Sequence, residues 1–382
     1  MQSTEFVPLT EEQHAIVNLS REFGAAEIRP AVSAVDDADT DTPWELWRKA
    51  AKAGIASFML PRQYGGGGFT DVYTQCLVRE ELSAADSPLA DLLTSGGFFA
   101  DPLLELGTDA QKERWLRPLT TDDPPMTALA VTEPDLGSGS AAITTKARRV
   151  GSGYKLTGAK TWISNGGVAD FYMLFATIDS ERRARGVTAF LIEKGASGLT
   201  FGEPQRTAGQ CAIVTTEVFL EDVFVPDDQR LGEEGQGFEG LTRTFDISRT
   251  MLGASAIGLA RACVDLATAY ADERAGLGKQ ITEQQAAQLA EMTTRIEASR
   301  LLTWRSAKLL DNHDDANAAS VAAKQHACQT AMFCSQVALQ TLGGNGHAHE
   351  FLAQKWTRDA KLHEIENGTL DMHLTTMGGS LR

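Results

Sequence analysis

Several side chains with catalytic potential lie close together near the end of the chain, in residues 358–369. Glu366 is a carboxylate, a group able to take up a proton in general base catalysis. Its neighbour Asn367 carries an amide, which has no basicity at any working pH. Any proton abstraction at this place in the chain therefore needs a group other than the side chain of residue 367.

Other residues that could suggest chemistry favour structural roles. His347 and His349 are two residues apart, so they do not share a helix face, and no metal site is expected there. Residues 65–68 are four consecutive glycines, but no Lys-Ser/Thr follows them, and a structural turn is predicted instead of a phosphate cradle. The cysteines show no CxxC pair and no metal spacing, which is typical of reduced, buried thiols in the cytoplasm; they are Cys76, Cys211, Cys263, Cys328 and Cys334.

The composition is that of an ordinary globular protein, with 382 residues, 42% hydrophobic and 23% charged. This length is sufficient for two or three domains. The formal net charge of −16 argues against a nucleic-acid-binding surface, which needs an excess of Lys and Arg. The N-terminus lacks the basic and apolar regions of a secretory signal, and no apolar run approaches the ~20 residues of a membrane span. A cytoplasmic protein is expected.

The pattern of the first part of the chain is helical, up to about residue 122. Thr10 and Gln13 have the spacing of a capping box, which predicts a helix that begins just after Thr10. Pro30 is expected to end that helix or to lie just beyond it. A second helix is predicted near residue 42, with Thr42 as N-cap and Pro43 in its first turn.

The character of the sequence changes twice after that. Residues 123–233 carry strand patterns such as 171–176 and 187–192, without helical crossovers, which predicts an antiparallel β-domain. Residues 234–382 are helical again, and four segments have the lengths of a helix bundle: 239–272, 283–311, 315–342 and 350–378. The predicted fold is α+β, with an N-terminal helical domain (1–122), a middle β-domain (123–233) and a C-terminal four-helix bundle (234–382).

The motifs in this order resemble those of the acyl-CoA dehydrogenase flavoprotein family over essentially the whole chain. The similar segments are Leu9-Thr10-Glu11-Glu12-Gln13, Val131-Thr132-Glu133-Pro134, Lys160-Thr161-Trp162-Ile163-Ser164-Asn165-Gly166, Gln340-Thr341-Leu342-Gly343-Gly344 and Arg358-Asp359-Ala360-Lys361. The resemblance implies the family's fold and non-covalently bound FAD. It also implies an acyl thioester substrate, carried by CoA or by a carrier protein.

The resemblance also implies which residues hold FAD. Val131 and Thr132 are expected at the pyrimidine edge of the flavin, Trp162 and Ile163 against the ring, and the Ser164 hydroxyl towards N5. Arg274 is expected to reach the pyrophosphate across a subunit interface, since a guanidinium suits phosphate. The other expected contacts are Leu277, Gln340, Gly343, Gly344, Thr369 and Asp371. Sites shared in this way imply a homotetramer, a dimer of dimers.

On the same resemblance, Ser138, Asp246 and Arg249 are expected on the substrate side, but the chain departs from the family pattern in three places. First, Asn367 stands where most members carry the catalytic Glu, and Ser248 occupies the position to which some members move that base. The loop 207–213 lacks the usual Arg and Ser, and Gly139 replaces a common Asp.

Two carboxylates remain as candidate bases. Glu366 occupies the place of a family Tyr that lies near the substrate; an ion pair is its ordinary structural role. Asp91 matches, approximately, the acid–base site of alicyclic acyl-CoA dehydrogenases in this family; its ordinary role is a solvated or capping Asp. If Asp91 is buried without a cation partner, its pKa is raised towards neutrality, which suits a base.

Four functions stay open at this point. The first is α,β-dehydrogenation of a thioester with Glu366 or Asp91 as base, and electron-transfer flavoprotein or O2 as acceptor. The second is a decarboxylating enzyme for a β-keto or malonyl-type acid, in which Asn367 binds the substrate carboxylate. The third is an oxygen-using relative, and the fourth is a silent subunit of a hetero-oligomer.

Overall fold

The computed structural model describes residues 7–38, 41–136, 142–276 and 282–380. Contacts between residues divide the chain into two units, each assembled from segments that are distant in the sequence. The helical unit consists of Met1–Ala34, Phe69–Asp91 and Thr250–His363. The mixed unit consists of Val35–Gly68, Leu92–Arg249 and Glu364–Arg382.

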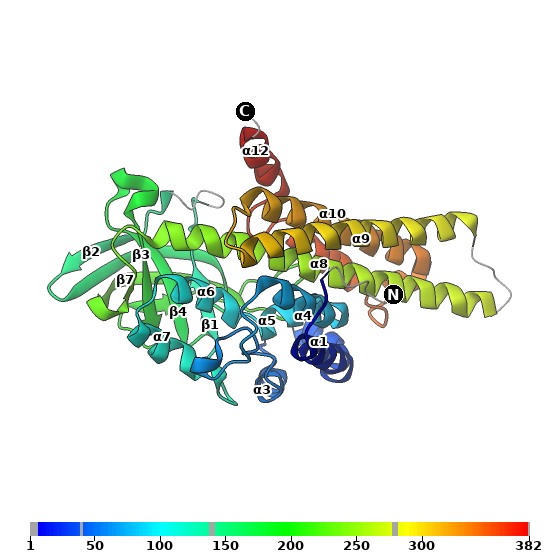
Figure 1. The fold of residues 1–382 in the computed structure, drawn as a ribbon, viewed down its shortest axis with the longest axis horizontal. Helices are drawn as coiled ribbons and strands as arrows, with labels where there is room; N and C mark the ends of the chain where they lie inside the picture. The colour runs from blue at the N-terminus through cyan, green and yellow to red at the C-terminus, as the bar shows by residue number, and fades with distance from the viewer. Residues whose placement is uncertain (1–6, 39–40, 137–141, 277–281, 381–382) are drawn as a thin grey trace. The chain divides into compact units, whose positions relative to one another are not determined.

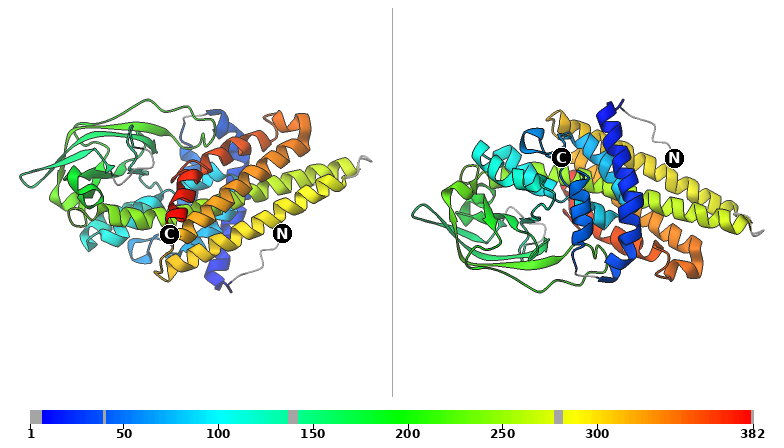
Figure 2. Two further views of the ribbon diagram at one scale, coloured as in Figure 1. Left: turned by 90° about the horizontal axis from the view of Figure 1, so that it is seen from above. Right: turned by 90° about the horizontal axis from the view of Figure 1, so that it is seen from below.

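Helices that pack against one another build the helical unit (Figures 1 and 2). Helix α4 contacts both α1 and α9, and α10 contacts both α9 and α11. The helices are α1 (Glu11–Phe23), η1 (Gly24–Ile28), α4 (Val72–Ala85), α9 (Glu283–Asp311), α10 (Asn317–Leu342), η7 (Gly343–His347), α11 (Ala353–His363) and the C-terminal part of α8 (Gly237–Gly276).

A buried charge network ties these helices together. The Glu80 carboxylate on α4 accepts hydrogen bonds from Arg300 of α9, at 2.7 Å, and from Arg261 of α8, at 2.9 Å. The charge of Arg300 is the main factor that lowers the pKa of Glu80, against a rise caused by burial. Since buried carboxylates are tolerated only with partners of this kind, the network fixes α4 against α8 and α9.

One sheet forms the centre of the mixed unit, and its strands run in the order β6-β7-β3-β2-β4-β5-β8, with β1 beside β4. The neighbours β3 and β7, and β4 and β5, pair antiparallel, as the sequence predicts. The pairing of β1 with β4 is parallel, which the sequence did not indicate, because the direction of a short strand depends on its distant partner. The strands are β1 (Thr127–Ala130), β2 (Lys146–Val150), β3 (Gly153–Ser164), β4 (Phe171–Thr177), β5 (Val187–Glu193), β6 (Leu199–Phe201), β7 (Thr215–Pro226) and β8 (Arg230–Leu231).

Helices and 3-10 turns complete the mixed unit. They are α3 (Trp44–Lys52), η2 (Arg62–Tyr64), α6 (Gly96–Leu106), α7 (Asp109–Leu116), η3 (Arg117–Thr120), η5 (Ser180–Gly186), η6 (Asp227–Gln229) and α12 (Leu370–Ser380). Helices α2 (Arg29–Ala38), α5 (Ser87–Leu93) and α8 have residues in both units.

The predicted capping box is present: the Gln13 N–H donates to Thr10 Oγ1 at 3.2 Å, and the Thr10 N–H donates to Gln13 Oε1 at 2.9 Å. The prediction for Pro30 was wrong, because the chain stays helical through it. The π-helical turn η1 precedes α2, and Pro30 lies in the first turn of α2, where its missing N–H removes no required hydrogen bond. The N-cap of α3 is Pro43 instead of Thr42.

The predicted final helix over 350–378 is divided into α11 and α12. Asn367 and Gly368, at φ 51° and 97°, lie between the two helices in the left-handed region. A right-handed helix cannot continue through that conformation, whereas Asn and Gly adopt it more readily than other residues. This break positions the segment that carries Glu366.

Helix α8 is long and apolar enough to cross a membrane, with a mean hydropathy of 1.3 over its best window. However, 78% of that window is buried inside the protein, so α8 is a core helix of a soluble protein. The five cysteines are also buried, as the sequence predicts, and none of them forms a disulfide.

Candidate active site and cofactor surfaces

The residue that replaces the usual catalytic Glu has a backbone role. The Asn367 carbonyl accepts a hydrogen bond from His373 Nε2 at 3.2 Å, which closes the left-handed turn before α12. Gly368 has φ 97°, a conformation that L side chains rarely adopt, so another residue at 368 would be strained. Asn tolerates the left-handed conformation better than Glu does, and this accounts for an amide at 367 on structural grounds. Glu366 lies half-buried in the same turn.

The Asp91 carboxylate on α5 is buried, with 9% of its surface exposed. Contrary to the condition set out above, it has a cation partner: Arg79 of α4 forms a short ion pair with Asp91 Oδ1. The Ser255 hydroxyl of α8 donates to the same oxygen at 2.9 Å. These donors favour the ionised carboxylate, the form that a base requires, and hold its orientation.

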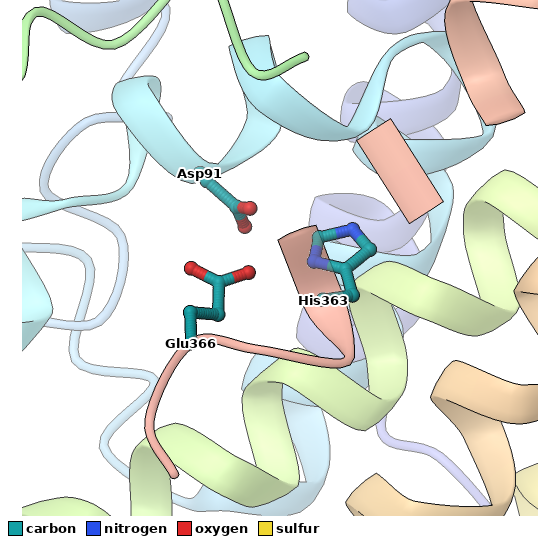
Figure 3. Close-up of side chains that lie close together, drawn as sticks. All are labelled: Asp91, His363 and Glu366. Carbon is teal, nitrogen blue, oxygen red and sulfur yellow. The ribbon is translucent and has the colours of Figure 1, made fainter. Parts of the chain in front are cut away.

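A histidine that the sequence analysis did not consider lies beside Asp91 (Figure 3). His363 is the last residue of α11 and is fully buried. Its Nε2 atom lies 2.8 Å from the hydroxyl oxygen of Ser87, a residue of α5. A ring nitrogen of His363 and a carboxylate oxygen of Asp91 lie within 4.8 Å of each other. The spacing of Asp359 and His363, four residues apart on a buried helix face, was the signal available in the sequence.

A buried three-residue charge cluster fixes α11 against the start of α5. Lys355 Nζ donates to Asp86 Oδ2 at 2.6 Å and to Asp359 Oδ2 at 2.8 Å. Burial raises the pKa of Asp86, and the nearby Asp359 charge adds to that rise, while Lys355 opposes it. Lys355 loses some proton affinity through burial, but its two carboxylates more than compensate and raise its pKa. The cluster thus holds His363 and Ser87 in register.

In the mixed unit, the predicted flavin-facing residues lie on β3 and on the neighbouring segment 131–132. The Thr161 N–H donates to the Thr132 carbonyl at 2.9 Å, which joins the 131–132 segment to the strand. The β3–β7 register shifts between Lys160 and Ile163, and within this bulge Trp162 has φ 57° and is 61% exposed. A bulky residue at positive φ is a strained conformation that recurs at functional sites. Ile163 is buried and Ser164 is exposed, so Trp162 and Ser164 are the side chains available to a ligand.

A buried ion pair joins the segment 131–133 to β3. Lys160 Nζ donates to Glu133 Oε1 at 2.8 Å and to the Val131 carbonyl at 3.0 Å. Burial raises the pKa of Glu133, but Lys160 and the donors of Thr144 and Thr145 outweigh it and hold the pKa at about 2. Burial lowers the pKa of Lys160 to about 8, against the effect of Glu133. Both groups are therefore charged at pH 7.

Replacing Lys160 with Met is expected to reduce FAD retention, because the Val131 carbonyl and Glu133 both lose their donor. The lost charge-assisted hydrogen bonds correspond to about 1.5–3 kcal/mol of stability. The FAD-to-protein ratio after gel filtration measures the effect. Lys155→Met is the matched control, since Lys155 lies on the same strand in an exposed pair with Asp222. Equal FAD retention in both variants would contradict a supporting role for Lys160.

The helical unit contains a polar pocket of about 420 Å³. Arg274, Gly343 and Gly344, all predicted FAD contacts, line it together with Tyr270, Gln285, Thr341, Leu342 and Asn345. The Tyr270 hydroxyl oxygen accepts from Arg274 Nη1 at 3.1 Å and lies 3.3 Å from Asn345 Nδ2. A Cβ atom at Gly343 or Gly344 would meet nothing within 4 Å, so the backbone there is open to a ligand. Tyr270 was missed by the sequence analysis.

The remaining predicted residues are distributed as follows. Gln340 is exposed on the last turn of α10 and does not line the pocket. Thr369 and Asp371 are exposed at the start of α12. Leu277 and Ser138 lie outside the described residues. In the mixed unit, Arg249 donates to Asp246 at 3.0 Å.

The structure describes two of the positions at which the chain departs from the family pattern. The Ser248 hydroxyl donates to the Phe245 carbonyl at 3.0 Å within α8, a bond that does not activate it as a base. In the loop 207–213, Cys211 is buried and Gln210 has φ 61°. An apolar, buried side chain therefore occupies the place where an Arg is usual.

Comparison with known proteins places the chain in a family. It matches the family domains described as "Acyl-CoA dehydrogenase, N-terminal domain" over residues 10–123, "middle domain" over 128–223 and "C-terminal domain" over 235–381. It is 36% identical to cyclohex-1-ene-1-carbonyl-CoA dehydrogenase of Geobacter metallireducens, over 98% of each protein.

Solved structures agree with that assignment. Butyryl-CoA dehydrogenase of Megasphaera elsdenii superposes with a TM-score of 0.92 and 33% identity, over 99% of this chain and 100% of that chain. A structure described as the electron transferring flavoprotein of Acidaminococcus fermentans gives the same TM-score and identity, over 99% of each chain. The chain belongs to the acyl-CoA dehydrogenase family.

The family assignment confirms the predicted fold, the oxidoreductase class and the cofactor. The protein is an FAD-dependent oxidoreductase that acts on the CH–CH bond of an acyl thioester. The observed surfaces fit FAD: the open glycines beside a guanidinium suit a pyrophosphate, and an exposed Trp suits a ring system.

Proposed function

We propose that the protein dehydrogenates an acyl-CoA at its α and β carbons, with Asp91 as the base that takes the α-proton. FAD, when bound, accepts the hydride that leaves the β-carbon. The observation that supports Asp91 most directly is its buried carboxylate, held by Arg79 and Ser255, in a chain whose residue 367 is an amide. Glu366 remains the alternative base.

The substrate class follows from the same carboxylate. Asp91 matches the acid–base position of alicyclic members, and a relative 36% identical to this chain is described as acting on cyclohex-1-ene-1-carbonyl-CoA. We therefore propose a short or alicyclic acyl group. On this proposal, Ser138, Asp246 and Arg249 belong to the substrate side of the site, and Asn367 shapes the turn that carries Glu366.

Anaerobic bleaching of the flavin by a panel of thioesters tests the proposal. The panel contains cyclohexanecarbonyl-CoA, cyclohex-1-ene-1-carbonyl-CoA and butyryl-CoA, each also as its carrier-protein thioester, together with malonyl-CoA and free β-keto acids. Bleaching by an acyl-CoA supports the proposal. Bleaching by malonyl-CoA or a β-keto acid alone, with release of CO2, overturns it in favour of the decarboxylating reaction. Bleaching by none of them contradicts thioester dehydrogenation.

The proposal also covers the electron acceptor, the oligomeric state and the compartment. Electron-transfer flavoprotein is the proposed electron acceptor, supported by the structural similarity noted above. A homotetramer in the cytoplasm is the proposed working form, with the Arg274 pocket contributed to an FAD of another subunit. Rapid consumption of O2 in place of electron-transfer flavoprotein reduction would identify an oxidase instead.

Arg274→Ala is expected to weaken FAD binding by roughly 10- to 100-fold, since a charge-assisted hydrogen bond contributes about 1.5–3 kcal/mol. If the pocket serves a neighbouring subunit, the tetramer is also weakened and dissociates at a higher protein concentration than the wild type does. FAD titration and analytical ultracentrifugation measure the two effects. Arg21→Ala is the control, because Arg21 is exposed in the same unit and pairs with Glu81. Unchanged FAD affinity in Arg274→Ala would remove this pocket from the cofactor site.

A further inference from the structure

Helix α5 presents Ser87 and Asp91 on one face, because residues four apart in a helix lie one above the other. His363 lies along that face, with Nε2 at 2.8 Å from Ser87 Oγ and a ring nitrogen within 4.8 Å of the Asp91 carboxylate (Figure 3). Both His363 and Ser87 are almost completely shielded from solvent, with 0% and 1% exposed. An imidazole is thus held next to the proposed base by a hydroxyl from the base's own helix.

The environment of Asp91 creates a need for a second proton acceptor. Arg79 and Ser255 both donate to Asp91 Oδ1, and donors of this kind stabilise the carboxylate relative to the acid. Imidazole is ordinarily the stronger base, with a pKa of about 6.5 against about 3.9 for Asp.

Three carboxylates and two cations, an excess of carboxylates, are buried on α4, α5, α11 and the α4–α5 junction: Asp86, Asp91, Asp359, Arg79 and Lys355. His326 on α10 lies near a cation instead. Its Nδ1 atom also lies 2.9 Å from a serine hydroxyl, that of Ser299, but burial and the Arg295 charge lower its pKa.

We propose that His363 relays the proton that Asp91 takes from the substrate, with Ser87 holding the imidazole in place. The inference rests on the proposed function. The substrate α-C–H bond breaks and an O–H bond forms on Asp91, while the hydride and its two electrons leave the β-carbon for FAD. The O–H bond of Asp91 then breaks as an N–H bond forms on neutral His363, which becomes imidazolium and restores the Asp91 carboxylate. His363 is a positioning residue, since it acts through Asp91.

Deuterium uptake from D2O into 3-thiabutyryl-CoA tests the relay. Sulfur replaces the β-carbon of this probe, so no hydride can leave, and only α-proton removal and exchange are observed. Asp91 alone returns the same proton to carbon, whereas relay to His363 allows it to exchange with solvent. Mass spectrometry measures the uptake, and the change in flavin absorbance on mixing measures probe binding.

His363→Gln is expected to slow deuterium uptake by roughly tenfold or more, with unchanged probe affinity. His363→Asn serves as the second variant, and circular dichroism shows that each variant is folded. His326→Gln is the matched control, since it also removes an imidazole bonded to a serine, and its uptake is expected to equal that of the wild type.

The failures of the relay and of the proposed function are distinguishable. Wild-type uptake in both folded His363 variants overturns the relay and leaves the proposed function intact. Loss of probe binding together with uptake also overturns it, since that result indicates a structural role. Wild-type uptake in an Asp91→Asn variant overturns the proposed base itself, whereas no uptake by the wild type overturns the relay.

Discussion

Asp91→Asn is expected to lower the turnover of the acyl-CoA that bleaches the flavin by about 10²–10⁴-fold, the usual effect of removing a general base. Asparagine keeps the shape of the side chain but cannot accept the α-proton. Stopped-flow measurement of flavin bleaching at saturating substrate isolates this step. The same loss in Glu366→Gln, with normal bleaching in Asp91→Asn, would assign the base to Glu366.

A second variant separates the loss of the base from misfolding. Asp91→Asn leaves the Arg79 cation buried without its partner, and such an uncompensated charge destabilises proteins by about 3–5 kcal/mol. The double variant Arg79→Gln/Asp91→Asn removes both charges and should retain the folded state but not the activity. Asp101→Asn is the control: Asp101 is a carboxyl in the mixed unit whose pKa burial raises to about 7, so an amide replaces a group that is already partly neutral.

The variant Asn367→Glu distinguishes the dehydrogenation from the decarboxylating reaction. The left-handed backbone at 367 costs a Glu about 1–2 kcal/mol, so a modest loss of stability is expected in either case. A dehydrogenase with Asp91 as base should keep its turnover of the acyl-CoA. A decarboxylating enzyme should lose activity, because a Glu repels the substrate carboxylate at short range.

Lys355→Met is expected to destabilise the protein by about 3–5 kcal/mol at pH 8, an effect as large as that of Asp91→Asn. Lys355 is 4% exposed and neutralises Asp86 and Asp359, which are 1% and 0% exposed. Its loss leaves two buried carboxylates side by side. Urea unfolding measures the effect. Lys49→Met, which breaks an exposed pair with Glu45, should change the stability by less than about 1 kcal/mol.

The destabilisation by Lys355→Met should shrink as the pH falls. Burial and Asp359 already raise the pKa of Asp86, so the folded state binds a proton there at a higher pH than the unfolded state does. Above the unfolded value, stability therefore decreases as the pH rises through the raised folded pKa. Without Lys355, the pH range over which stability falls extends towards neutrality. Protonation of Asp86 at pH 5 relieves its repulsion with Asp359. A difference between wild type and variant that is the same at pH 5 and pH 8 would contradict this account.

The sequence by itself determined the family, the fold class and the cofactor. Local chemistry carries that information: the Thr10–Gln13 capping box, the alternating strands and the ordered motifs around Thr132, Trp162 and Gly343 are all contiguous in the chain. The replacement at position 367 was equally visible, because it is a single residue within a contiguous motif.

The tertiary structure decided what lies around the proposed base. Arg79, Ser255 and His363 are distant from Asp91 in the sequence or on other helices, so only packing shows that Asp91 has a cation partner and a neighbouring imidazole. The same holds for the pair of Lys355 with Asp86, which lies between α4 and α5, whereas Asp359 is four residues from Lys355 on α11. The helix break at Asn367 was also not predicted from the sequence, because hydrophobic periodicity reports burial and not the sign of φ. Whether a carboxylate acts as a base depends on the charges and donors that long-range folding brings to it, and periodicity along the chain does not contain them.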